Sequence, residues 1–363
     1  MNGAGDPFDI LRLIRSRRVG PATFHRLIAE HGTAIAALTE LPSIARAAGM
    51  TDYAPCPPGV VKAELAAGRR AGARLVTWGA PGYPAALRDM ADAPPALWLR
   101  GNGAVLERQA IAVVGARNAS SLGLRMARSM AGGLARAGIA VVAGLARGID
   151  TVAHEATLKT GTIAVMAGGI DVVYPQENTA LAASICETGL LVSEQPPGTA
   201  PTARHFPARN RIISGLSRAV VVIEAASRSG SLITARNALD QGREVMAVPG
   251  HPLDARAGGC NALIRDGAIL VRDSGDVLRA LDLPEGMAQA EPAPEPAPPP
   301  RPPAEIGGDL LTRVVGRLGP SPTDENLLIR DLGLSPATLA PVILELELSG
   351  RVQRMPGGML ALT

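Results

Sequence analysis

Cysteine and histidine are scarce in this sequence, and their scarcity excludes several kinds of site. The 363 residues include three cysteines and five histidines. Cys56, Cys186 and Cys260 lie far apart and form no CxxC pair, and no histidine stands at zinc-ligand spacing. We therefore expect buried thiols rather than a disulfide framework, and neither a metal nor a cofactor.

Long apolar runs are also missing. The first residues carry Asp6 and Asp9 instead of the apolar segment of a signal peptide, and no later uninterrupted run approaches the length of a membrane span. These features predict a cytoplasmic protein with no membrane partner.

Catalytic motifs are absent as well. The sequence has no GxxxxGK[ST], GxSxG or HExxH, and VGARNASSLG stands where a dinucleotide-binding domain would carry GxGxxG. Asp150 and His154 are one helical turn apart, which suits either an acid–base pair or a capping aspartate beside a structural histidine. Cys260 is either a nucleophile or a buried thiol. Because no catalytic centre is recognisable, we do not expect an enzyme.

Lysine is nearly absent although the chain is mildly basic. Lys62 and Lys159 are the only lysines and the formal net charge is +3, so arginine supplies almost all of the positive charge. Arginine suits bidentate contacts to phosphate. Aromatic residues make up 2% of the chain, and residues 110–283 hold only Tyr174 and Phe206. This composition permits nucleic-acid binding without establishing it.

Short apolar segments alternate with helical patterns in the centre of the chain. The segments predicted to be buried strands are 111–115, 139–143, 162–166, 190–192, 219–223 and 244–248. Strands that alternate with helices predict a doubly wound parallel sheet with right-handed crossovers and helices on both faces. In such a sheet, ligands bind outside the carboxyl ends of the strands.

Polar and glycine residues gather at these predicted carboxyl ends. Following the strands in order, they are Arg117 and Asn118, Gly144 to Asp150, Gly168 to Asp171, Glu194 to Gly198, and Ser229 to Thr234. The sequence therefore predicts one crevice that is rich in glycine and bears arginines.

The turn before the helix that ends near Gln241 has the composition of an anion site. Gly230 permits close backbone approach, and the Ser231 and Thr234 hydroxyl groups add donors to the free amides of a first helical turn. Serine or glycine at a helix start is equally an ordinary N-cap. Phosphate binding and plain capping both remain open.

The segment HFPARNRIISG joins an aromatic residue to arginines. An exposed Phe206 beside Arg209 and Arg211 would stack on bases and clamp phosphates, as proteins do that hold single strands without reading their sequence. In the alternative, Phe206 is buried and one of the arginines pairs with Glu194 or Glu224.

Smaller domains flank the central one at 110–283. Residues 1–75 show helical periodicity, and their RVGPA turn is either half of a helix-hairpin-helix or an ordinary helix connection. Residues 76–109 are predicted to be an irregular connector packed on the core, and residues 284–307 an extended tether rich in proline and alanine.

Residues 308–363 have the element order of a winged helix. The predicted recognition helix, SPATLAPVILELELSG, carries Glu345 and Glu347 and no basic residue, so insertion into a DNA groove would set carboxylates against phosphates. We expect a protein-interaction or packing module.

Seven segments of the chain, in consistent order, resemble one known family. They are VVGARNASSLG, VAGLARGIDTVAHEATL, AGGIDVVYPQEN, SEQPPGTAP, HFPARNRIISGLS, EAASRSGSLITARNALDQGREVMAVPG and GCNALIRDGA. Together they closely resemble the DNA-processing protein A (DprA, also called Smf) family over about Tyr83 to Val271. Ordered motifs in this number are far more specific than a single glycine loop.

The resemblance implies an extended Rossmann-like core with an N-terminal SAM or helix-hairpin-helix-like domain and a C-terminal winged-helix-like module. It further implies a homodimer that binds single-stranded DNA and loads RecA recombinase during natural transformation. The DNA-binding residues expected on this basis are Arg117, Asn118, Gly144, Arg147, Phe206, Arg209, Arg211, Ser229, Gly230, Ser231 and Thr234. Many relatives carry lysines in the pocket region, whereas arginine must supply that charge here.

Two functions of different classes are carried forward. In the first, the crevice binds single-stranded DNA without chemistry, with a steep dependence on salt. In the second, the chain is a nucleotide-processing enzyme similar to phosphoribohydrolases of the same Rossmann variant, which carry a PGGxGT loop where this chain has Ser227 to Ser231. The double glycine and the catalytic glutamate that follows it are missing here. We favour DNA binding.

Overall fold

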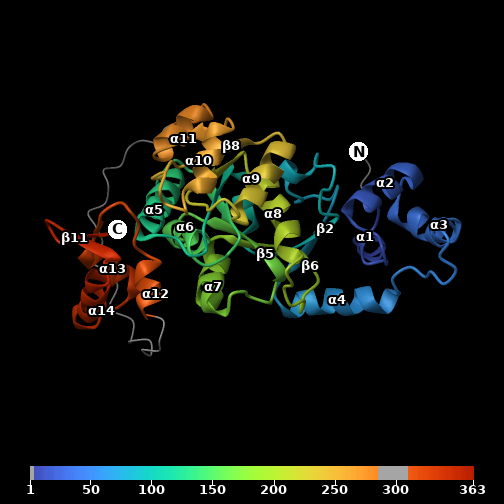
Figure 1. Ribbon diagram of the computed structural model, residues 1–363. Helices are drawn as coiled ribbons and strands as arrows, with labels where there is room; N and C mark the ends of the chain where they lie inside the picture. The colour runs from blue at the N-terminus through green and yellow to red at the C-terminus, as the bar shows by residue number, and fades with distance from the viewer. Residues whose placement is uncertain (1–3, 285–309) are drawn as a thin grey trace.

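A computed structural model describes residues 4–284 and 310–363 of the chain. Figure 1 shows a central sheet domain with a small domain at each end. Except for Pro284, the predicted tether at 284–307 lies outside the described residues. No single helix in the described ranges has the length and apolar character to cross a membrane. One bent pair of helices, Glu325–Leu332 with Pro336–Leu348, could do so by length and composition only, and Leu328, Leu339 and Ile343 of this pair are buried in the core of the C-terminal module.

Four helices form the N-terminal domain: α1 Pro7–Ile14, α2 Pro21–His31, α3 Ala34–Ala47 and α4 Pro58–Arg70. Prolines begin α1, α2 and α4, at a position where the missing N–H breaks no helical hydrogen bond. The side chains of Asp6 and Thr33 cap α1 and α3 by accepting from backbone amides of the first turn. The apolar faces of these helices pack around the fully buried Phe24.

The central domain is built on a nine-stranded sheet in the order β1-β2-β6-β5-β4-β3-β7-β8-β9. The strands are β1 Arg74–Thr77, β2 Ala96–Gly101, β3 Ala110–Val114, β4 Ala140–Ala143, β5 Thr162–Gly169, β6 Leu190–Gln195, β7 Ala219–Val222, β8 Glu244–Ala247 and β9 Ile269–Leu270. Strands β3 to β9 pair in parallel, which confirms the predicted doubly wound sheet. The chain runs outward from β3 to β6, then returns to β7 on the other side of β3, so the topological switch point lies between β3 and β7.

One edge of the sheet differs from the prediction of an irregular connector. Residues 96–101 form β2, which pairs antiparallel with both β1 and β6. Pro94 and Pro95 stand directly before this strand, and proline disfavours a paired strand locally. The strand nevertheless forms, because Ala96 to Leu99 are buried in the sheet and pair with residues distant in the sequence.

Helices cover both faces of the parallel strands. One layer holds α5 Ser121–Arg136, α6 Ile149–Thr157, α7 Thr179–Thr188 and α11 Ser274–Ala280, and the other holds α8 His205–Gly215, α9 Ser231–Asp240 and α10 Gly258–Arg265. In β3, Ile111 and Val113 face the first layer while Ala112 and Val114 face the second, which is the alternation expected of a strand buried on both sides.

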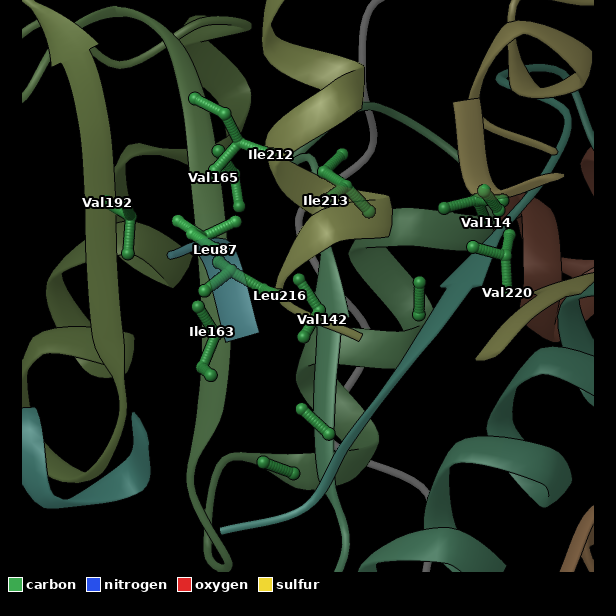
Figure 2. Close-up of a cluster of buried hydrophobic side chains, with 14 of the residues drawn as sticks. Leu87, Val114, Val142, Ile163, Val165, Val192, Ile212, Ile213, Leu216 and Val220 are labelled. Carbon is green, nitrogen blue, oxygen red and sulfur yellow. The ribbon is translucent and has the colours of Figure 1, made fainter. Parts of the chain in front are cut away.

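Packing in the second layer fixes helix α8. Figure 2 shows Ile212 and Ile213 of α8, with Leu216 directly after the helix, lying over Val142 of β4 and Val165 of β5. Full burial of each such side chain stabilises the fold by about 1.5–3 kcal/mol. The first turn of α8, which carries Phe206, is therefore held in place from below.

The C-terminal module has the helix and strand order of a winged helix, as predicted. Its elements are α12 Leu310–Val315, β10 Thr323–Asp324, α13 Glu325–Leu332, α14 Pro336–Leu348, β11 Val352–Met355 and β12 Met359–Leu362. The strands form a separate sheet in the order β10-β12-β11. Leu328, Leu339, Ile343 and Leu360 are fully buried in its own small core.

A buried carboxylate joins the N-terminal domain to the core. Glu64 of α4 accepts from Arg15, with Nη2 and Oε1 2.9 Å apart, and from the Trp98 indole at 3.1 Å. Arg15 also donates to the Glu194 carbonyl at 3.2 Å. Next to this network, a Cβ atom placed on Gly68 would lie 2.0 Å from a ring carbon of Trp98.

We predict that Gly68→Ala lowers the free energy of unfolding by about 1–3 kcal/mol, because Trp98 is buried and cannot yield easily. Gly59→Ala in the same helix is the matched control, since nothing lies within 4 Å of its Cβ position. There, alanine should leave stability unchanged or raise it by up to about 1 kcal/mol. Urea unfolding measures both, and equal stability of the two variants would contradict the packing described.

Candidate nucleic-acid interface

Four loops of the central domain meet at the carboxyl edge of the sheet. They follow β5, β4, β3 and β7, which are neighbours in that order. The loops carry Tyr174, Arg147, Arg117 and Ser229 respectively. Because parallel strands end at the same edge, these residues form a row there, and the first turn of α8 brings Phe206 to the same place.

Arg117, Phe206 and Tyr174 form a continuous stack. The guanidinium carbon of Arg117 lies 5.0 Å from the centre of the Phe206 ring. The Phe206 and Tyr174 rings meet edge to face, with their centres 5.6 Å apart. Phe206 is half-buried, Arg117 is exposed and Tyr174 is 53% exposed. The stack therefore presents an accessible π surface next to a positive charge, a combination that suits an unpaired base and its phosphate.

Several arginines near the stack carry unneutralised charge. Within residues 4–284 and 310–363, Arg117, Arg204 and Arg228 are exposed and make no ion pair. Arg147 pairs with Glu177, with Nε and Oε1 2.7 Å apart, and both side chains are more than half exposed. Exposed pairs of this kind contribute only about 0–1 kcal/mol, so a phosphate can replace the carboxylate at little cost.

Arg209 lies below the surface, in contrast to the expectation of a phosphate clamp. Arg209 is 7% exposed, and its guanidinium donates to the carbonyls of Gly144, at 2.6 Å, and Val165. Burial lowers the pKa of Arg209 to about 10, which still leaves it charged at neutral pH. Gly144 makes room for it, because a Cβ atom there would lie 2.6 Å from the guanidinium.

Arg211 is also engaged within the protein. It pairs with Glu194 at 2.6 Å and with Asp92 at 3.4 Å, which confirms the predicted alternative of a pair with Glu194. Arg209 reaches the Val165 carbonyl of β5, whereas Arg211 reaches the Glu194 carboxylate at the end of β6. Neither guanidinium is available to a phosphate in this arrangement, so their role here is to position α8.

The turn at Ser229 to Ser231 is tightly bonded within itself. The Ser229 and Ser231 hydroxyl oxygens are 2.7 Å apart, and Ser231 and Thr234 are buried. The Leu232 amide donates to the Ser229 carbonyl, so part of the expected anion cradle already has a partner. Gly230 is exposed with open space around it, and no side chain caps α9. Ser229 and Gly230 therefore remain the reachable part of this turn.

The three candidate catalytic residues, Asp150, His154 and Cys260, are buried inside the core. The Asp150 carboxylate accepts from the amides of Gly144, at 2.9 Å, and Ala146. His154 is fully buried between the Thr162 hydroxyl, 2.9 Å from Nδ1, and an amide, and burial lowers its pKa to about 3. Cys260 is buried, and burial raises its pKa to about 12, which confirms the buried thiol. An unreactive thiol and a neutral, enclosed imidazole give no nucleophile to this edge.

A carboxylate occupies the helix start that a nucleotide phosphate would need. Glu224, just after β7, accepts two hydrogen bonds from Ser120, the residue before α5. The Ser120 amide nitrogen lies 3.0 Å from Oε1, and the Ser120 hydroxyl oxygen lies 2.6 Å from Oε2. A cleft of about 400 Å³ opens beside it and is also lined by Asp254, Gly250 and Gly319. Both Glu224 and Asp254 pair with Arg256, at 3.9 and 3.1 Å, so the arginine that reaches this cleft is already neutralised, unlike those of the row.

Sequence reasoning missed Asn178 and the contact of Glu224 with the start of α5, both of which shape the edge. The buried Asn178 amide donates to the Leu145 carbonyl and to the Thr151 hydroxyl, both at 2.9 Å, and so holds the loop after β4. Asn178 stands in the AGGIDVVYPQEN segment, which was the only signal for it. Glu224 lies in the run before the Ser229 turn, and its capping of α5 depends on a contact 104 residues away in the sequence.

Comparisons with known proteins identify the family of the chain. A family model described as DNA recombination-mediator protein A matches residues 74–282. The chain belongs to the DprA/Smf family. The family's models for a DprA-like N-terminal HHH domain and a DprA winged helix domain match residues 5–67 and 292–358, which supports the helix-hairpin-helix interpretation of the first domain.

Individual members of the family are similar over most of the chain. Protein Smf of Escherichia coli is 41% identical over 77% of this chain and 75% of its own length. DNA processing protein DprA of Bacillus subtilis is 42% identical over 62% of this chain and 76% of its own length.

Two solved DprA structures share the fold. The structure of DNA processing protein A from Streptococcus pneumoniae aligns with a TM-score of 0.66 and 37% identity, covering 76% of this chain and 98% of that one. The Helicobacter pylori DprA structure, which describes a single-stranded DNA binding mode, aligns with a TM-score of 0.54 and 27% identity over 59% of this chain and 99% of that one.

The buried histidine generates a prediction about pH. The pKa of His154 in the folded chain, about 3, lies below the ordinary value of 6.5, so the unfolded chain binds this proton more tightly. The stability contributed by neutral His154 is therefore complete above about pH 6.5 and is lost progressively below it, by up to about 1.4 kcal/mol per pH unit.

His154→Gln should lose this part of the pH dependence, because glutamine can accept from the Leu145 amide and does not titrate. Urea unfolding of wild type and variant between about pH 7 and about pH 5 measures the difference. Burial raises the pKa of Asp150, but Asp150 is present in both proteins, so its contribution to the pH dependence cancels when they are compared. Parallel stability curves for the two proteins would refute the account of His154.

Proposed function

We propose that this member of the DprA/Smf family binds single-stranded DNA along the carboxyl edge of its central sheet. The observation that carries the proposal is the stack of Arg117, Phe206 and Tyr174, with a charged group and two aromatic rings in contact on an accessible surface. A base stacks on Tyr174 or Phe206, and the adjoining phosphate accepts from Arg117. Duplex DNA cannot offer an unstacked base to these rings, so the single strand is preferred.

A row of positive charge extends this contact along the strand. Arg147, Arg204 and Arg228 lie in loops that flank the stack and are exposed. The reachable Ser229 and Gly230, and the exposed Asn118, supply further polar contacts to the backbone of the strand. In this proposal, Arg209, Arg211 and Gly144 act as positioning residues below the surface, and Ser231 and Thr234 support the turn from within.

We base a finer role on membership of the family. We propose that the protein acts in the cytoplasm as a homodimer, protects incoming single strands and loads RecA recombinase onto them during natural transformation or homologous recombination. The naming of relatives as DNA processing proteins and the single-stranded DNA binding mode described for the Helicobacter pylori protein support the DNA part of this role. We propose no catalytic step.

A nucleotide-processing enzyme is the weaker alternative. Such an enzyme needs a phosphate at a helix start near the switch point and a carboxylate or nucleophile beside it. Here Glu224 fills the start of α5 and is itself bonded to Ser120. Cys260 and His154 are buried. Release of free base from a nucleoside monophosphate by the protein would favour the nucleotide-processing enzyme over DNA binding.

Fluorescence anisotropy of a labelled oligo-dT, compared with a duplex of equal length over a series of salt concentrations, tests the proposal. We predict that Phe206→Ala weakens single-strand binding by about 5- to 100-fold, since base–aromatic stacking contributes about 1–3 kcal/mol per base. Arg117→Ala should weaken binding and reduce the slope of log affinity against log salt by about one phosphate contact.

Arg69→Ala is the matched control, because Arg69 is an exposed arginine on α4 and its loss changes the net charge equally. It should leave affinity nearly unchanged. Equal binding of single strand and duplex, or equal losses in Arg69→Ala and Arg117→Ala, would show that the stack is not the site.

A further inference from the structure

The winged-helix module is fastened to the loop that carries Arg117 by a reciprocal set of hydrogen bonds, which we call the clasp. Its members are Arg256, Ala119 and Ser121 of the core and residues 316–318 of the module. Arg256 donates to the carbonyls of Gly316, at 2.7 Å, and Leu318. In return, Arg317 donates to the Ala119 carbonyl at 2.6 Å, and the Ser121 amide donates to the Arg317 carbonyl at 3.1 Å.

Helix chemistry explains why the clasp forms at this point. Gly316 and Leu318 directly follow the end of α12, where helical carbonyls lack partners within the helix. A guanidinium satisfies such carbonyls and is favoured by the negative end of the helix. Arg317, which lies between these two residues, is half-buried, and burial lowers its pKa. Its main hydrogen bond goes to the core rather than to its own module.

The clasp holds the C-terminal end of the loop that carries Arg117. Ala119 is two residues after Arg117, and Asn118 lies between them, close enough that a Cβ atom on Gly316 would be 3.2 Å from its amide nitrogen. At the N-terminal end of the same loop, the Ala116 carbonyl accepts from the Ile149 amide of the core at 3.2 Å. The core thus holds the first end of the loop from residue 116 to residue 121, and at the other end the module adds its bonds at Ala119 and Ser121 to the contact of Ser120 with Glu224.

We propose that docking of the winged-helix module through Arg317 positions the Arg117 loop and so raises the affinity of the core for single-stranded DNA. Arg317 is a positioning residue, since it touches the loop backbone and no part of the stack. The composition of α14, which carries Glu345 and Glu347 and no basic residue, fits a module that acts by contact with the core. The inference rests on the proposed function of the stack.

The test combines oligo-dT anisotropy with hydrogen–deuterium exchange of the full chain. We expect Arg317→Ala to raise the Kd about threefold to tenfold, the range set by loss of one hydrogen bond that orders a binding loop. Exchange of the amides from residue 117 to residue 121 should become faster, because Ser121 loses its acceptor when the module undocks. Arg317→Lys, which keeps the charge and one donor, should recover part of both effects.

Arg313→Ala is the control for charge. Arg313 is exposed on α12, four residues before Arg317, and its one bond among the described residues is a long one of 3.4 Å inside its own module. Three results would overturn the proposal: an unchanged or lower Kd in Arg317→Ala while the loop exchanges faster, an equal loss in Arg313→Ala, or a raised Kd with unchanged loop exchange. If wild type fails to bind single strands, the proposed function fails, while the exchange data still show whether Arg317 holds the loop.

Discussion

The arrangement of the candidate site depends on one buried guanidinium. Arg209 reaches from α8 under the edge of the sheet and ties the Gly144 carbonyl after β4 to the Val165 carbonyl of β5. Such a buried charge is tolerated only when its hydrogen bonds are made, and glycine at 144 is what leaves space for it. Phe206 lies one helical turn before Arg209, so the same bonds that hold the strands together also place the ring of the stack.

Charge divides the carboxyl edge of the sheet into two regions with different uses. Near the switch point, the Glu224 carboxylate fills the start of α5, where a doubly wound protein commonly holds a nucleotide phosphate. On the side of β3 that faces β4 and β5, Arg117 is exposed beside the Phe206 ring, and Arg147 is exposed in the loop after β4. A mononucleotide would need the first region, whereas a polymer with a phosphate at every step can use the second. The fold is therefore shared with nucleotide-binding proteins, but the ligand chemistry differs.

The sequence predicts the elements well and the environment of individual arginines poorly. Apolar strands, glycine turns and the winged-helix order depend on local patterns, and the structure confirms them. Strand β2 was missed because its pairing with β6 is a long-range contact that the prolines before it obscure locally. Three arginines that the sequence does not distinguish lie in different environments. Arg117 is exposed, Arg209 is buried against the sheet, and Arg211 is paired with Glu194. The packing of α8 decides the environments of Arg209 and Arg211, whereas Arg117 lies in the loop after β3.

Photochemical cross-linking of an oligo-dT substituted with 5-iodouracil tests the central claim most directly, because the cross-link forms where a base touches a side chain. Mass spectrometry then identifies the residue. The account predicts adducts on Tyr174 or Phe206, which lie 5.6 Å apart between ring centres, and their loss when duplex replaces the single strand. Adducts confined to the N-terminal domain or to the winged-helix module, with both of these rings unmodified, would contradict it.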